Sequence, residues 1–187
     1  MPGPLAGFQV AIITSNTGVE HDEFVVPRDR LRERGAQVLH AAAKAEPVQT
    51  YRHDLEPAET FEPDTTIDSL DPVEVDVLVI PGGTVNADRL RTDPHACALV
   101  RSLTSAGVPI AAICHGPWVL VDAEVITGKT LTSYPSLRTD IANAGGWWVD
   151  DAAVRSDEND WPLITSRNPR DLPAFVDAIT AAATDRS

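Results

Sequence analysis

The fold class follows from one stretch of the sequence, Val108-Pro109-Ile110-Ala111-Ala112-Ile113-Cys114-His115-Gly116-Pro117-Trp118. An apolar run leads directly into Cys114, small residues (Ala112 and Gly116) lie two positions to either side, and a proline suited to the first helical position follows. A strand, a tight turn and a helix in this order form a nucleophile elbow, which lifts a reactive side chain above the carboxyl edge of a parallel sheet. The stretch therefore predicts a parallel sheet with Cys114 at that edge.

The segments on either side of this turn alternate between strand and helix patterns. Apolar, β-branched runs predict strands over residues 9–14, 37–43, 75–80 and 108–113, with helices over 23–34 and 94–106 between them. Weaker patterns predict helices over 117–123 and 137–144, strands over 129–132 and 147–149, and a last helix that Asn168 caps and Pro169 begins. This alternation predicts an α/β fold, a three-layer sandwich with a mostly parallel sheet and helices on both faces.

The length of 187 residues suits one sizeable core, so we expect a single domain over residues 1–187 with its core at about 9–183. Residues 44–74 are rich in Pro, Asp, Glu and Thr and have weak periodicity. They predict a loop, or short strands attached to the edge of the sheet, rather than a second domain.

The charge balance argues against two classes of partner. Fifteen basic residues oppose twenty-eight acidic ones, giving a net charge of −13, which repels nucleic-acid phosphates and anionic lipid headgroups. No apolar run approaches the roughly 18 to 20 residues that span a bilayer, and the first residues lack the basic and apolar blocks of a signal peptide. We therefore expect a cytoplasmic protein that binds neither nucleic acid nor membrane.

The position of Cys114 has a chemical consequence. A thiol at a helix N-terminus faces unpaired N–H groups and the positive end of the dipole, which favour the thiolate and could also hold an oxyanion. The simpler interpretation is a small buried residue at a strand end. The other cysteine, Cys97, lies in a helical pattern without an activating neighbour and is interpreted as a core residue.

A cysteine hydrolase also needs a base. No histidine follows residue 115, and the four others precede the cysteine, so His115 is the obvious nitrogen near the sulfur. Three roles stay open for it: bonding the thiol, orienting a substrate, or only filling the turn. A metal site is not indicated, because Glu20, His21, Asp22 and Glu23 lack a recognised ligand spacing.

Several motifs together resemble the ThiJ/PfpI superfamily, which includes PfpI-type intracellular protease-like proteins, bacterial general stress proteins and the Parkinsonism-associated deglycase. The resemblance runs from Gln9 to about Ile179 and implies a flavodoxin-like fold of the class I glutamine-amidotransferase type. It rests on Gly18-Val19-Glu20-His21-Asp22-Glu23-Phe24-Val25-Val26-Pro27, Val79-Ile80-Pro81-Gly82-Gly83, Ala111-Ala112-Ile113-Cys114-His115-Gly116-Pro117, Thr132-Ser133-Tyr134-Pro135 and Asn143-Ala144-Gly145-Gly146-Trp147-Trp148-Val149-Asp150.

The resemblance also implies roles for individual residues. Cys114 would be the nucleophile, His115 its partner, and Glu23 the carboxyl at the sulfur; in a partly dry pocket that carboxyl is expected to be protonated. In the protease-like branch an acidic residue of a neighbouring subunit completes a triad, and Asp88 is the best match although its spacing differs by one residue. The protein would then be a homodimer or a larger homo-oligomer.

Residues around this set are expected to shape the pocket. Gly82 and Gly83 follow a buried strand and either aim a backbone amide at an oxyanion, together with the amide of His115, or only form a tight turn. Tyr134 and Trp118 would border the pocket, with a subunit contact as the alternative for Trp118.

The function that the resemblance implies is a stress-response cysteine enzyme that acts without a cofactor on reactive carbonyls or their protein adducts, as a deglycase or glyoxalase does. Two alternatives stay open. One is a PfpI-type intracellular cysteine peptidase or amidase, and the other is a non-catalytic stress protein that senses oxidants through Cys114.

Overall fold

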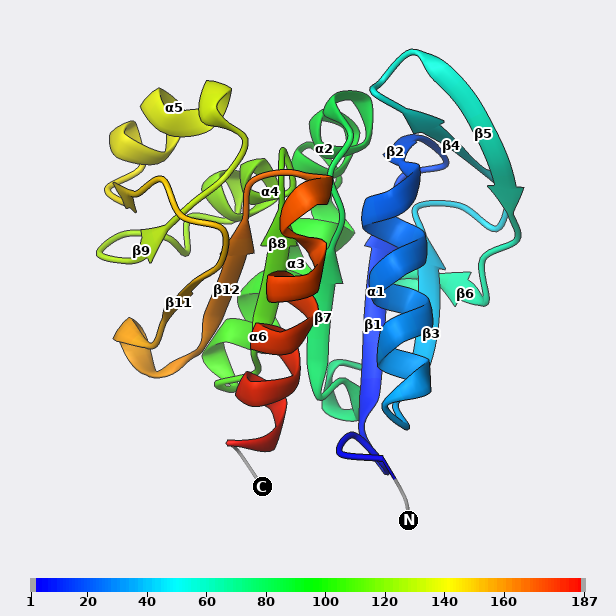
Figure 1. The fold of residues 1–187 in the computed structure, drawn as a ribbon, viewed down its shortest axis with the longest axis horizontal. Coiled ribbons are helices and arrows are strands. Elements are labelled where there is room, and N and C mark those ends of the chain that lie inside the picture. The colour runs from blue at the N-terminus through cyan, green and yellow to red at the C-terminus, as the bar shows by residue number, and fades with distance from the viewer. Residues whose placement is uncertain (1–2, 186–187) are drawn as a thin grey trace.

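A seven-stranded sheet forms the centre of the protein in the computed structural model, which describes residues 3–185 (Figure 1). Six of its strands are parallel, and only the edge strand β11 is antiparallel to its neighbour. The order across the sheet is β11 (Val154–Ser156), β12 (Leu163–Ser166), β8 (Ile110–Ile113), β7 (Val77–Ile80), β1 (Gln9–Thr14), β3 (Gln37–Ala42) and β6 (Thr65–Thr66). The expected mostly parallel α/β architecture is confirmed.

The strand order shows where a ligand would bind. Numbered along the chain, the five central strands β1, β3, β7, β8 and β12 lie in the spatial order 2-1-3-4-5, which is the flavodoxin-like arrangement. The strand order reverses between β1 and β7. At such a point the loops that follow the two strands run in opposite directions, which leaves a crevice at the carboxyl edge of the sheet. The turn that contains Cys114 follows β8, the neighbour of β7.

Helices cover both faces of the sheet (Figure 1). α1 (His21–Glu33) and α6 (Leu172–Thr184) lie on one face, and α2 (Thr84–Arg91), α3 (Pro94–Ser105) and α4 (Pro117–Asp122) lie on the other, with α5 (Arg138–Asn143) beyond α4. Val10 and Ile12 of β1 pack in the core with Phe24 and Phe175, whereas the alternate residues Ala11 and Ile13 belong to the opposite core. One strand therefore contributes to both cores, because successive side chains point to opposite faces.

Two smaller sheets extend this framework. β2 (Thr17–Glu20), β4 (Val48–Arg52) and β5 (Glu56–Phe61) form one, and β9 (Thr130–Leu131) and β10 (Trp147–Trp148) form the other. Residues 44–74 thus contain an edge strand of the main sheet, β6, as expected, but also a β4–β5 hairpin that pairs with β2 instead. Figure 1 places this hairpin near the carboxyl ends of the central strands.

Several elements differ from the prediction. The helix α2 and the strands β2, β11 and β12 were not predicted. Asn168 does cap through its side chain, which accepts from the N–H of Arg170, but residues 169–171 form a 3₁₀ turn and α6 begins at Leu172. Within residues 3–185, no helix combines the length and apolar character needed to cross a bilayer.

Candidate active site

Cys114 lies in a sharp turn between β8 and α4. Its φ angle is +62°, a left-handed conformation that costs energy for a residue with a Cβ atom and that is typical of a nucleophile elbow. The turn needs a small residue at Gly116, because a Cβ atom there would lie 2.6 Å from the carbonyl oxygen of Ile80 and 2.9 Å from that of Ile113. Two backbone hydrogen bonds hold Cys114 in place. Its N–H donates to the carbonyl oxygen of Ser166 (3.0 Å), and its own carbonyl oxygen accepts from the N–H of Tyr134 (2.9 Å).

The thiol lines a cavity of about 300 Å³ at the carboxyl edge of the sheet. The side chain of Cys114 is largely buried, and the residue is only 8% exposed, so it lies at the floor of the cavity rather than above the surface. The lining consists of Glu20, Glu23, His53, Asp54, Gly83, Thr84, Cys114, His115, Tyr134, Asn168 and Pro169. These residues come from the end of β2 and the start of α1, from the turn of the β4–β5 hairpin, from the turn between β7 and α2, and from the segments that follow β8, β9 and β12.

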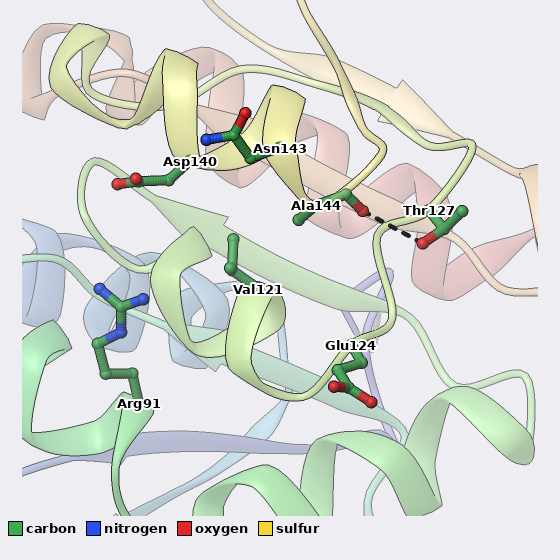
Figure 2. Close-up of a pocket in the computed structure, with 7 residues that line it drawn as sticks. All are labelled: Arg91, Val121, Glu124, Thr127, Asp140, Asn143 and Ala144. Carbon is green, nitrogen blue, oxygen red and sulfur yellow. Dashed lines mark hydrogen bonds between the residues drawn. The ribbon is translucent and has the colours of Figure 1, made fainter.

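A larger cavity, of about 660 Å³, lies between the ends of α2, α4 and α5 (Figure 2). It is lined by Arg91, Val121, Glu124, Thr127, Asp140, Asn143 and Ala144 and does not include the cysteine. The guanidinium of Arg91 is already held by Asp122 through two hydrogen bonds of 2.9 and 3.0 Å. The smaller cavity is the candidate active site because it contains Cys114 together with titratable side chains around it.

Glu23 belongs to the first turn of α1 and is fully buried beside Cys114. Its Oε2 atom accepts a hydrogen bond of 2.8 Å from the N–H of Gly82, whereas Oε1 has no hydrogen-bonding partner of ordinary geometry among residues 3–185. Gly82 is squeezed between the two side chains, since a Cβ atom on it would lie 2.3 Å from Glu23 Oε2 and 2.7 Å from Cys114 Cβ. The Gly pair therefore does more than form a tight turn, because it lets the backbone reach the carboxyl and the thiol.

Burial raises the pKa of the Cys114 thiol well above its ordinary value, and a negative charge on Glu23 raises it further. The backbone N–H groups of Gly83 and His115 donate toward the sulfur and lower this pKa, but burial outweighs them. The expectation of a lowered thiol pKa is therefore wrong, although the N–H groups at this turn do act in the expected direction. The physical reason is that the thiol is almost closed off from water and that α4 has only six residues.

Burial also raises the pKa of the Glu23 carboxyl well above its ordinary value, and the charge of Glu20 acts in the same direction. The hydrogen bond from Gly82 opposes this shift, but it comes from an amide and not from a cation. Burial therefore favours the protonated form of Glu23. A neutral Glu23 no longer repels a negative sulfur, so Cys114 loses its proton more easily than it would beside a carboxylate.

The imidazole of His115 lies beside the sulfur. Its Nδ1 atom is 3.2 Å from Cys114 Sγ, and its Nε2 atom is 3.3 Å from the Oγ atom of Ser136. The imidazole stacks on Tyr134 with ring centroids 4.8 Å apart. Burial lowers the pKa of His115, and the negative charge of Asp54 acts in the opposite direction. The imidazole is therefore neutral at pH 7 and able to accept a proton.

Three of the expected residues, Gly82, Asp88 and Trp118, do not line this cavity, although Gly82 contacts Glu23 and Cys114 from behind its wall. Asp88 is exposed on α2 and does not line the cavity of its own chain. Trp118 lies behind His115, with ring centroids 5.2 Å apart, and its Nε1–H donates to Asp140. Tyr134 does line the cavity, as expected.

Other cavity residues carried no sequence signal. His53 and Asp54 lie in the hairpin turn within residues 44–74, where weak periodicity gave no reason to expect a site. Glu20 was considered only as a metal ligand, although its place three residues before Glu23 would bring both acids to the same end of the helix. Within residues 3–185, no group of three or more His, Cys, Asp or Glu side chains is arranged to hold a metal ion.

Comparisons with known proteins agree with this geometry. A deglycase of Pyrococcus horikoshii is 38% identical over 168 residues, which cover 90% of this chain and 95% of that protein. Protein/nucleic acid deglycase 2 of Escherichia coli is 36% identical over 156 residues, covering 83% and 87%. The crystal structure of Drosophila melanogaster DJ-1beta matches with a TM-score of 0.83 and 34% identity, over 95% of this chain and 91% of that one.

The name of the Escherichia coli protein includes nucleic acid, whereas the net charge of the present chain argued against such a partner. That expectation stays a prediction for this chain. The model of the DJ-1/PfpI family matches residues 9–182, and the motifs that indicated the ThiJ/PfpI superfamily lie within this range. The chain therefore belongs to the DJ-1/PfpI family.

Proposed function

We propose that the protein is a stress-response cysteine enzyme that converts reactive 2-oxoaldehydes such as methylglyoxal, or their adducts on protein amino groups, to hydroxy acids. One observation carries the proposal: Cys114, Glu23 and His115 line the same cavity, with the imidazole 3.2 Å from the sulfur and a fully buried carboxyl beside it. The deglycase names of relatives at 36–38% identity support the same class of reaction.

The first step in this proposal is addition of the sulfur to the aldehyde carbon. His115 Nδ1 takes the thiol proton while the new S–C bond forms and the carbonyl electron pair moves onto oxygen. The N–H groups of Gly83 and His115, which donate toward the sulfur, lie where they could also stabilise that oxygen. Glu23 or the imidazolium then returns a proton, which gives a neutral hemithioacetal.

The second step moves a hydrogen between the two carbons of the substrate. Removal of a proton from the former aldehyde carbon and its return to the neighbouring carbon yield a lactoyl thioester on Cys114. Water hydrolyses this thioester to lactate and restores the thiol, so the net reaction is methylglyoxal plus water to lactic acid. When the substrate is an adduct on a protein amino group, the sulfur first forms a bond to the adduct's former aldehyde carbon and the C–N bond breaks. The amine takes up the thiol proton as it leaves, and the same hemithioacetal results.

Lactate formation from methylglyoxal tests this proposal directly. We expect turnover by the unmodified protein and no turnover above background by Cys114→Ser. Cys97→Ser is the matched control, because Cys97 is also buried but lies on α3, outside the cavity, and should leave the rate unchanged. Equal lactate formation by all three proteins would contradict the proposal.

A redox sensor is the second candidate, and the unpartnered Oε1 atom of Glu23 favours it. A protonated carboxyl beside the sulfur can donate a hydrogen bond to a sulfinate, which stabilises that oxidised form. Peroxide titration followed by mass spectrometry distinguishes this function. Selective oxidation of Cys114 without any lactate formation would favour the sensor, and cleavage of a fluorogenic peptide that Cys114→Ser lacks would favour the peptidase alternative.

The proposal includes a homo-oligomer and an action without cofactor. Asp88 is exposed on α2 and is thus available to a second copy of the chain, where it could act on that copy's His115.

A further inference from the structure

The turn of the β4–β5 hairpin brings a carboxylate into the wall of the cavity. Asp54 accepts two hydrogen bonds from Thr84, the first residue of α2: Oδ1 from the backbone N–H at 2.8 Å and Oδ2 from Oγ1 at 2.6 Å. The neighbouring N–H of His53 donates to Glu20 Oε2 at 3.0 Å. Both hairpin residues have a positive φ, +54° for His53 and +63° for Asp54, so the chain adopts a costly conformation to make these contacts.

These contacts hold both oxygens of Asp54 in place at the wall of the cavity. Both carboxylate oxygens act as acceptors, which is the pattern of a carboxylate rather than of a neutral acid. The carboxylate also lies at the N-terminus of α2, where the helix dipole favours a negative charge.

His115 lines the same cavity and needs such a charge. When Nδ1 accepts the thiol proton, the imidazole becomes a cation in a site where burial disfavours cations. Within the part of the chain that the structure describes, its other nitrogen contacts the neutral hydroxyl of Ser136, so the imidazolium has no charged hydrogen-bonding partner there.

Several charged or titratable groups surround this imidazole. They are Cys114, Glu23 of α1, Glu20 of β2, His53 and Asp54 of the hairpin, and Tyr134, with Arg91 and Asp140 on the far side of Trp118. Among the acids, Glu20 and Glu23 each have a pKa that burial raises. Asp54 is the acid whose charge opposes the effect of burial on the pKa of His115.

We propose that Asp54 is a positioning residue for His115: its carboxylate, held by Thr84 in the wall of the cavity, stabilises the imidazolium that forms when His115 takes the thiol proton. The inference rests on the proposed function, since it concerns the proton transfer at the same site. Under this proposal His115 has an acidic partner, Asp54, in its own chain, in addition to any Asp88 from a second copy.

The direct test is an NMR titration of the His115 imidazole in the folded protein. In Asp54→Asn we expect the pKa of His115 to fall by about half a unit, because one negative charge across a cavity is lost. Asp54→Glu keeps the charge and should retain most of the original value. The matched control is Asp71→Asn, which removes an exposed carboxylate that also accepts a backbone N–H, from Val73 at 3.0 Å, but lies outside the cavity.

The second readout is the pH profile of kcat/KM with methylglyoxal. If His115 acts as the base, Asp54→Asn should move the acidic limb to lower pH by the same amount and reduce the plateau by about tenfold, whereas a purely structural role would leave the limb in place. An unchanged pKa of His115 in Asp54→Asn would overturn the proposal. A lowered pKa of His115 together with the unmodified protein's pH profile and rate would also overturn it. If no variant forms lactate, the proposed function fails, but the titration still decides whether Asp54 acts on His115.

Discussion

At the scale of single residues, the chemistry of the site depends on where one proton lies between Cys114 and Glu23. Burial raises the pKa of both groups, so only one of them can hold a negative charge at modest cost. The sequence motifs were enough to predict that these residues belong together. They could not predict that the thiol would be so deeply buried, because burial depends on hairpin and loop segments that have no clear pattern.

The variant Glu23→Gln tests whether the pKa of Glu23 is raised in the folded protein. The folded Glu23 has a raised pKa, so between its unfolded value near 4.5 and its folded value the folded protein binds more protons than the unfolded chain. Stability from this group therefore falls as the pH rises through that range. We expect Glu23→Gln to gain stability over the unmodified protein between pH 4 and pH 8, by about 1 kcal/mol or about 2–4 °C in Tm.

The same variant should lose activity, because the amide cannot exchange a proton with the substrate. The expected loss in kcat is at least about 100-fold. Thermal unfolding at both pH values, together with the lactate assay, checks the two effects. A constant difference in stability across pH would mean that Glu23 titrates normally in the folded protein.

At the scale of elements, strong patterns were predicted and weak ones were not. The strand over residues 9–14 was predicted at its observed bounds, because its four central residues are apolar and pack alternately on the two faces of the sheet. The helix α2 was missed because only Ala87 and Leu90 are buried apolar residues on it. The strand β12 was missed because its four residues end in Thr165 and Ser166, which do not form an apolar run although they are buried.

The turn between β7 and α2 gives a prediction at this scale. Gly83 has a φ of +93°, and a Cβ atom there would lie 2.0 Å from the carbonyl oxygen of Gly18. Gly128 is a matched control, since its φ is +78° but a Cβ atom would meet nothing within 4 Å. Both alanine variants have the conformational cost of about 1 kcal/mol, whereas Gly83→Ala adds a backbone clash. Denaturant unfolding should show a larger loss for Gly83→Ala, and equal losses would contradict the observed packing.

The segment that precedes β12 is held by a buried amine. Lys129 is fully buried, and its Nζ atom donates to the backbone carbonyls of Ser156, Glu158 and Trp161. Burial lowers the pKa of Lys129 from 10.5 to about 8. Between these two values the unfolded chain binds more protons than the folded protein, so the contribution of Lys129 to stability rises as the pH rises from about 8 to 10.5.

Lys129→Met removes this titration and leaves three carbonyl oxygens without their donor. We expect the variant to be less stable than the unmodified protein, with a difference that grows by at most about 3 kcal/mol between pH 8 and pH 10.5. Denaturant unfolding at the two pH values measures the difference, and a difference that shrinks over this range would contradict the lowered pKa.

At the scale of the whole molecule, both cores share the strands of one sheet, so we expect residues 9–183 to unfold in a single transition as one domain. The arrangement of this sheet was predictable from the alternation of elements. The assembly was not, because nothing in one chain's pattern specifies which surface meets a second copy. The role of Asp88 therefore stays a prediction that depends on oligomerisation.

A mixing experiment tests that role. Asp88→Asn should reduce lactate formation by about tenfold or more if its carboxylate acts on the neighbouring chain, and Cys114→Ser should be inactive. When the two variants are unfolded together and refolded, mixed oligomers contain a site with Cys114 of one chain and Asp88 of the other. Activity should then recover in part, whereas full activity of an Asp88→Asn monomer would exclude the shared site.

The central claim is that the sulfur of Cys114 forms a covalent bond with the substrate. Rapid acid quenching of the protein during turnover of methylglyoxal, followed by peptide mass spectrometry, tests this claim most directly. We predict a lactoyl group on the peptide that contains Cys114, absent from the peptide that contains Cys97 and absent from Cys114→Ser. Lactate release at the normal rate while Cys114 is never modified, or while another residue carries the group, would contradict the account.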